Sequence, residues 1–148
     1  MNKFKTFGGI LFFLLLGSSV KAQRYKNAAG IRFSTNAAVI NNALSFKHFF
    51  TGSTALEGLL SFDPLAIGLL VEKHNAIGPT GLDWFIGGGA YVGFSQRKNL
   101  GAQGVLGLDY KIPSLPLNFS LDWKPELNLL KDTFFEPAAV GVSARFAF

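Results

Sequence analysis

A strict alternation of apolar and polar residues is the feature that most constrains how this chain folds. From 117 to 129, bulky apolar residues occupy the odd positions, Pro125 among them, and polar or charged residues occupy the even positions. Successive side chains of a β-strand point to opposite sides, so this pattern predicts a two-sided strand. The segment 82–94 repeats it, with one apolar face and one face of mostly small or polar residues. Both segments are near or above the length that crosses a bilayer at a tilt, and most strands of soluble proteins are shorter.

Six further segments show the same alternation. The last of them ends on the final residue of the sequence, Phe148. An even total of eight strands predicts an all-β fold, an eight-stranded antiparallel up-and-down transmembrane β-barrel. Glycine, proline and serine mark three short turns at 51–53, 75–81 and 113–116, which we expect on the periplasmic side. The other connections, which we expect to be extracellular loops, are 35–42, 63–64, 95–100 and 130–137. The six additional strands are expected at 29–34, 43–50, 54–62, 65–73, 101–112 and 138–148.

The first 22 residues have the three parts of a secretory signal peptide. Lys3 and Lys5 give a positive start, 9–16 is a short apolar core, and 20–22 (Val-Lys-Ala) fits a cleavage site. The apolar core is too short to cross roughly 30 Å of hydrocarbon as a helix. We therefore expect residues 1–22 to be a cleaved signal and residues 23–148 to form one barrel domain in the cell outer membrane.

Composition excludes several classes of protein. The chain has no cysteine, so an exported disulfide-stapled fold is excluded. Its formal charge of +5 includes three lysines of the expected signal, and the remaining small charge argues against nucleic acid as a partner. It is 49% hydrophobic, yet beyond the signal it has no run of about 20 apolar residues. That combination fits either a soluble domain with a rich core or a barrel whose outer face meets lipid.

Charged residues fall on the inward phase of the expected strands. An eight-stranded barrel has an interior just wide enough to be filled by side chains. Six acidic and five basic residues nearly cancel there, and buried charges are tolerated when they are paired and hydrogen-bonded. We therefore expect a polar network that fills the lumen and leaves no wide pore. Its expected members are Arg32, Lys47, Glu57, Glu72, Asp83, Asp109, Lys111, Asp122, Lys124, Glu126 and Arg145.

The sequence shows no catalytic, cofactor or metal-binding pattern. Asp122 and Glu126 are four residues apart in a strand, about 13 Å, which is too far for two carboxylates acting on one bond. Lys124 between them indicates ion pairing. His48 is expected on the lipid-facing phase and His74 beside a turn, and neither belongs to a visible Ser/His/Asp arrangement or metal-ligand spacing. We expect no enzyme activity and no cofactor.

Five segments recur in this order in one family: 45–49 (SFKHF), 55–58 (ALEG), 84–90 (WFIGGGA), 107–113 (GLDYKIP) and 116–125 (PLNFSLDWKP). The chain resembles the small outer-membrane β-barrel proteins common in Bacteroidetes, a Gram-negative group, from about Gly30 to Phe148. The resemblance implies an eight-stranded barrel in the outer membrane and implies no activity. The last strand, with Phe146 and the terminal Phe148, resembles the signal that the barrel-assembly machinery recognises. The expected partners are therefore outer-membrane lipid and that machinery.

Three functional hypotheses follow, in this order. The first is a structural or interaction barrel of the outer membrane without catalysis. The second is a soluble periplasmic carrier of small ligands, similar to a lipocalin, whose apolar face would line a cavity and whose charges would face water. The third is a lipid-modifying barrel enzyme that depends on His48 or His74.

Overall fold

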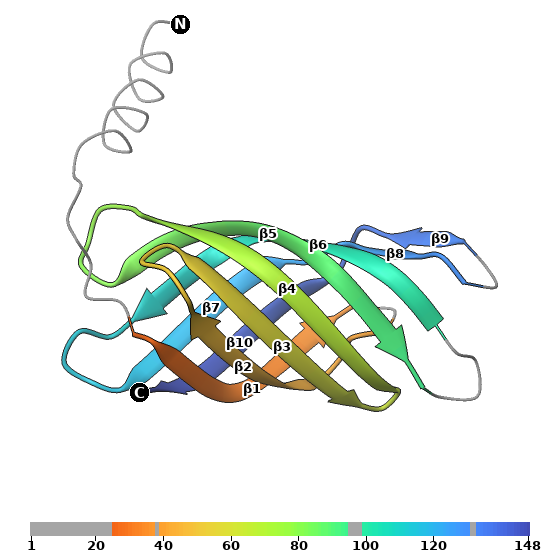
Figure 1. The fold of residues 1–148 in the computed structure, drawn as a ribbon, viewed down its shortest axis with the longest axis horizontal. Coiled ribbons are helices and arrows are strands. Elements are labelled where there is room, and N and C mark those ends of the chain that lie inside the picture. The colour runs from red at the N-terminus through yellow and green to blue at the C-terminus, as the bar shows by residue number, and fades with distance from the viewer. Residues whose placement is uncertain (1–24, 38, 95–98, 131–132) are drawn as a thin grey trace, which may run out of the picture.

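The computed structural model describes residues 25–37, 39–94, 99–130 and 133–148. The expected signal peptide lies outside these residues, as do parts of the expected loops at 35–42, 95–100 and 130–137. Every described element is a β-strand (Figure 1). The strands are β1 (Asn27–Thr35), β2 (Ala43–Phe49), β3 (Thr54–Phe62), β4 (Leu65–Ala76), β5 (Leu82–Gly93), β6 (Asn99–Lys111), β7 (Leu117–Trp123), β8 (Glu126–Asn128), β9 (Phe134–Glu136) and β10 (Val140–Ala147).

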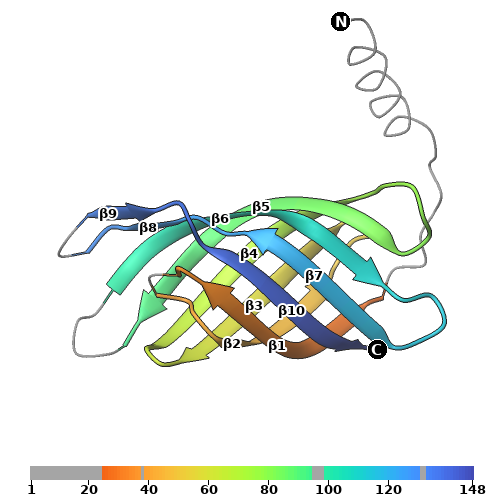
Figure 2. The same cartoon turned by 180° about the vertical axis from the view of Figure 1, so that it is seen from behind.

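The strands form one closed antiparallel barrel. Each strand from β1 to β6 pairs with its neighbours in sequence, and the last strand, β10, pairs with β1 to close the ring (Figure 2). β7 and β8 lie one after the other along β6 and together form one barrel strand. β9 and β10 lie one after the other on the other side of this strand, because β9 pairs with β8 and β10 pairs with β7. The ten segments therefore make eight barrel strands, and the predicted eight-stranded up-and-down barrel is confirmed.

Two ends of the barrel are distinguished by their connections. The turn end carries the connections 50–53, 77–81 and 112–116, together with Phe148 (Figure 1). The loop end carries residues 36–37 and 39–42, the two-residue link 63–64, the end of β5 beside the start of β6, and the protruding strands β8 and β9 (Figure 1). Strand boundaries agree with the predicted ones within a few residues, except where β7 is interrupted. The inward and outward residues also agree with the alternation, because a one-residue slip would exchange the two faces of a strand.

The strand expected at 117–129 is interrupted. β7 ends at Trp123 and pairing resumes at Glu126, with Lys124 and Pro125 between them. Proline has no N–H to give to a ladder, which explains the break that Pro125 predicts. The carbonyl of Pro125 still accepts a hydrogen bond from the backbone N–H of Gly104, at 3.0 Å, so the sheet stays closed across the interruption. The expected loop 130–137 also contains a strand, β9.

Glycines let β5 lie close to β4. A Cβ built on Gly89 would lie 1.8 Å from the carbonyl oxygen of Leu69, and one on Gly87 would lie 2.2 Å from that of Val71. Only glycine fits these two positions without a backbone shift. Between them, a Cβ on Gly88 would meet Gln103 at an ordinary distance of 3.4 Å.

Candidate functional site

The interior of the barrel holds the charged residues expected there. Ten of the eleven are at most 4% exposed. Lys111 differs, because it lies half-buried at the turn end of β6, where its Nζ donates hydrogen bonds to the carbonyls of Ile112 (2.6 Å) and Leu115 (2.7 Å). The strand ends at Lys111, so its long side chain folds over the turn and not into the lumen.

Arg145 of β10 joins three other strands near the turn end. Its guanidinium donates to the carboxylate of Glu57 on β3, and its Nε donates to Ser45 Oγ on β2 at 2.6 Å. Its Nη1 donates to Asn118 Oδ1 at 3.1 Å and to Ser120 Oγ at 2.9 Å, both on β7. The ion pair between Arg145 and Glu57 therefore spans the lumen, and the two residues are 88 positions apart in sequence.

Lys47 of β2 forms the second ionic centre. Its Nζ lies 2.8 Å from a carboxylate oxygen of Glu72 on β4 and 3.6 Å from one of Asp109 on β6. The ammonium also lies 4.6 Å from the ring centroid of Phe85, a cation–π distance. Lys47 and Glu72 have no exposed surface, so each depends on the other for compensation of its charge.

His74 extends this centre. β4 runs three residues past the expected end at Lys73, which turns the imidazole of His74 into the lumen, where it is fully buried. Its Nε2 lies 2.8 Å from the Glu72 carboxylate and its Nδ1 lies 3.8 Å from that of Asp83. The ring stacks on Phe85 with centroids 4.9 Å apart. The sequence placed His74 beside a turn and missed this contact set, although its even position continued the inward phase.

Tyr25 closes the turn end from inside. Its hydroxyl donates to the carboxylate of Asp109, with an O–O distance of 3.2 Å, and its ring meets Phe49 edge-on at 5.1 Å. Burial raises the pKa of the Tyr25 phenol well above its ordinary value, so the hydroxyl stays a donor. Ala28, Ala55 and Ala147 complete this buried cluster. Sequence analysis missed Tyr25 because it precedes the first alternating segment.

Two more ion pairs occupy the middle of the lumen and its loop end. Arg32 of β1 and Asp122 of β7 form a two-pronged pair, with Nη2 to Oδ1 at 2.7 Å. Lys124 Nζ lies 2.7 Å from Glu126 Oε1 and forms the second ion pair. The other acidic neighbour of Lys124, Asp122, pairs with Arg32. These contacts fit the ion pairing that the spacing of 122, 124 and 126 indicates.

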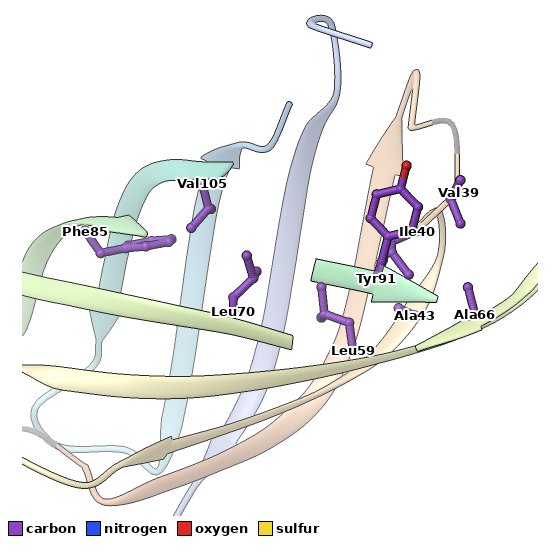
Figure 3. Packing of buried hydrophobic residues seen from close by; sticks show 9 residues of the cluster. All are labelled: Val39, Ile40, Ala43, Leu59, Ala66, Leu70, Phe85, Tyr91 and Val105. Atoms are coloured by element: carbon purple, nitrogen blue, oxygen red, sulfur yellow. The ribbon is translucent and has the colours of Figure 1, made fainter. Parts of the chain in front are cut away.

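The connection between β1 and β2 folds inward over this last pair. The Glu126 carboxylate accepts hydrogen bonds from the backbone N–H groups of Val39, at 2.9 Å, and Ile40, at 3.3 Å. Both side chains are at most 1% exposed and pack against Tyr91 and other apolar residues of the interior (Figure 3). The lumen is therefore filled by ion pairs and by apolar side chains. An apolar Val-Ile pair within an otherwise polar or small loop was the sequence signal for this insertion.

The outer surface has the opposite character. The outward positions of the strands carry mainly leucine, isoleucine, valine and phenylalanine, and many of these side chains are 40–60% exposed. Among the outward positions of the described strands, the only basic side chains are Lys73 and His48, and none is acidic. Both lie toward the turn end, where Lys73 Nζ donates to Ser53 Oγ and His48 Nδ1 lies 2.7 Å from Asn27 Oδ1. Phe146 and Phe148 are more than half exposed on this surface.

The described part of the chain has no cluster of three or more His, Cys, Asp or Glu side chains that could hold a metal ion. Residues 25–37, 39–94, 99–130 and 133–148 contain no helix long and apolar enough to cross a membrane. No protein-family model matches the chain, and no curated protein or solved structure matches it either.

Proposed function

We propose that this protein is an integral β-barrel of a bacterial outer membrane, with a side-chain-filled lumen and a structural or interaction role. The observation that carries the proposal is the inverted placement of side chains: charges lie inside, and large apolar residues lie outside on every side of the barrel. A soluble protein rarely exposes a contiguous apolar surface of more than a few hundred Å². A bilayer turns that surface into a favourable contact.

The dimensions of the strands support the same proposal. β4, β5 and β6 contain 12, 12 and 13 residues, and a tilted strand of about 9–11 residues crosses the hydrocarbon. Lys73 and His48 lie where an interface with water is expected. The resemblance to small barrels of Bacteroidetes is the basis for assigning the bilayer to the outer membrane, with the turn end in the periplasm. Phe146 and Phe148 would then serve the assembly machinery.

The filled lumen supports a role without transport or catalysis. The inserted Val39–Ile40 segment and the ion pairs across the lumen occupy the space that a channel requires. The imidazole of His74 is fully buried against Glu72 and Phe85, and that of His48 contacts Asn27, so both rings are engaged within the barrel. A partner would meet the exposed surfaces at the loop end.

The lipocalin-like carrier shares this fold class, so the two hypotheses differ in which face of the sheet is apolar. A carrier needs an apolar cavity, whereas this interior holds Lys47, Glu72, Arg32 and Asp122. The test is to fractionate cells that produce the full chain and to run the outer-membrane pellet on a gel with and without boiling. Recovery in that pellet with a mobility shift on boiling supports the proposal. Release as a soluble periplasmic protein without detergent refutes it and favours the carrier.

A further inference from the structure

The outward surface of β1–β4 is hollowed by an apolar groove of about 650 Å³. Ala29 of β1, Phe46 of β2 and Gly58 of β3 lie opposite one another in one cross-strand row along it. A Cβ built on Gly58 would meet no atom closer than 3.9 Å, so open space adjoins Phe46. The small residues on either side of Phe46 are what leave this part of the surface unfilled.

A second hollow, of about 180 Å³, continues the first toward the loop end. The two share Ile31 and Leu44 as walls. The second hollow lies where β1 and β2 part: their last pair is Arg32 with Ala43, while β1 runs on to Thr35. Phe33 and Phe62 wall this part, and Asn42 is its exposed polar side chain, because the Arg32 side chain points into the lumen.

We propose that the two hollows together bind one acyl chain of a membrane lipid, with the lipid's polar head beside Asn42. The inference rests on the proposed membrane location. The larger hollow falls within the range of about 300–1,000 Å³ that small-molecule sites occupy. Its lining is almost wholly apolar, and one exposed polar side chain, Asn42, joins at the loop end, which matches the polarity of an amphiphile. A flexible chain of methylene groups fits a groove sunk between side chains better than the convex wall of a second barrel does.

The test uses the full mature chain folded into phosphatidylcholine vesicles that contain a phosphatidylcholine with a photoreactive diazirine in its acyl chain. Labelled peptides are identified by mass spectrometry. Gly58→Phe and, independently, Ala29→Phe fill the groove with an outward ring. Gly88→Phe is the matched control, because Gly88 is likewise an outward-facing glycine, on β5, outside the groove. A boiling shift on the gel shows that each variant is folded.

We expect labelling to concentrate on peptides of β1–β3 and to fall about tenfold there in Gly58→Phe and Ala29→Phe, because the added ring occupies the groove and removes the packing contacts of the acyl chain. Gly88→Phe keeps the wild-type pattern. Even labelling around the barrel, or labelling that Gly58→Phe leaves unchanged, overturns the groove as a lipid site. Cross-links between two copies through β1–β3 would overturn it in favour of a second copy. In both of these cases the protein still floats with the vesicles, whereas failure to float overturns the membrane location itself.

Discussion

Removal of the Arg145 guanidinium is predicted to lower the free energy of unfolding by more than the loss of any single hydrogen bond in the barrel. In Arg145→Met the Glu57 carboxylate, 2% exposed in the wild type, loses its cationic partner. It keeps one hydrogen bond from Ser45 Oγ at 2.5 Å, and Asn118 and Ser120 each lose a donor. Breaking a buried pair by removing one partner costs about 3–5 kcal/mol, because an uncompensated charge remains.

The assay is reversible unfolding by urea in lipid vesicles, followed by tryptophan fluorescence, for the wild type and for Arg145→Met, Glu57→Gln and the double variant. The double variant removes both charges, so it should recover part of the loss, with a coupling energy of about 1–3 kcal/mol between the two sites. If Arg145→Met falls within about 0.5 kcal/mol of the wild type, the interior pairing is not what stabilises the fold. Strictly additive single changes would contradict the direct contact.

Three further changes test separate parts of the structure. Gly89→Val places a Cβ where the Leu69 carbonyl already lies and should abolish the boiling shift, whereas Gly88→Val should fold. Glu126→Ala should release the inserted loop that the carboxylate holds through Val39. A cysteine introduced as Val39→Cys should then react with an aqueous maleimide faster than in the protein that keeps Glu126. Equal rates would mean that the carboxylate does not hold the loop. Leu69→Arg, near the middle of the apolar run of β4, should cost about 2–4 kcal/mol in vesicles, and a neutral effect would argue against lipid contact.

The alternation of the sequence was sufficient to predict the eight strands and the two faces of the barrel. When one face of a strand is buried, each residue must lie on a definite face, so the alternation of 117–129 is enough to predict which side chains point inward. Even the interruption at Pro125 had a local cause, the missing N–H. Local patterns of this kind act within a strand or between neighbouring strands, and a single sequence shows them.

The pairing across the lumen could not be predicted in this way. Arg32 and Asp122 are 90 residues apart, and their contact depends on the tilt and stagger of all eight strands, which no local pattern encodes. The alternation placed Lys111 inside, but its strand ends there and the side chain bonds to the turn. The buried positions of Val39 and Ile40 depend on hydrogen bonds to Glu126, which is 87 and 86 residues away in sequence, and no local pattern indicates that contact.

Contact between the outward face of the strands and lipid can be tested most directly by fluorescence quenching. The chain has no cysteine, so Leu69→Cys introduces a single thiol that can carry a fluorophore on the outward face of β4. Thr51→Cys, at the turn end, is the control for a group in water. For the protein assembled in vesicles, we expect brominated acyl chains to quench the label at 69 and aqueous iodide to quench the label at 51. Quenching at 69 by iodide and not by brominated lipid would contradict contact between the outward face and lipid.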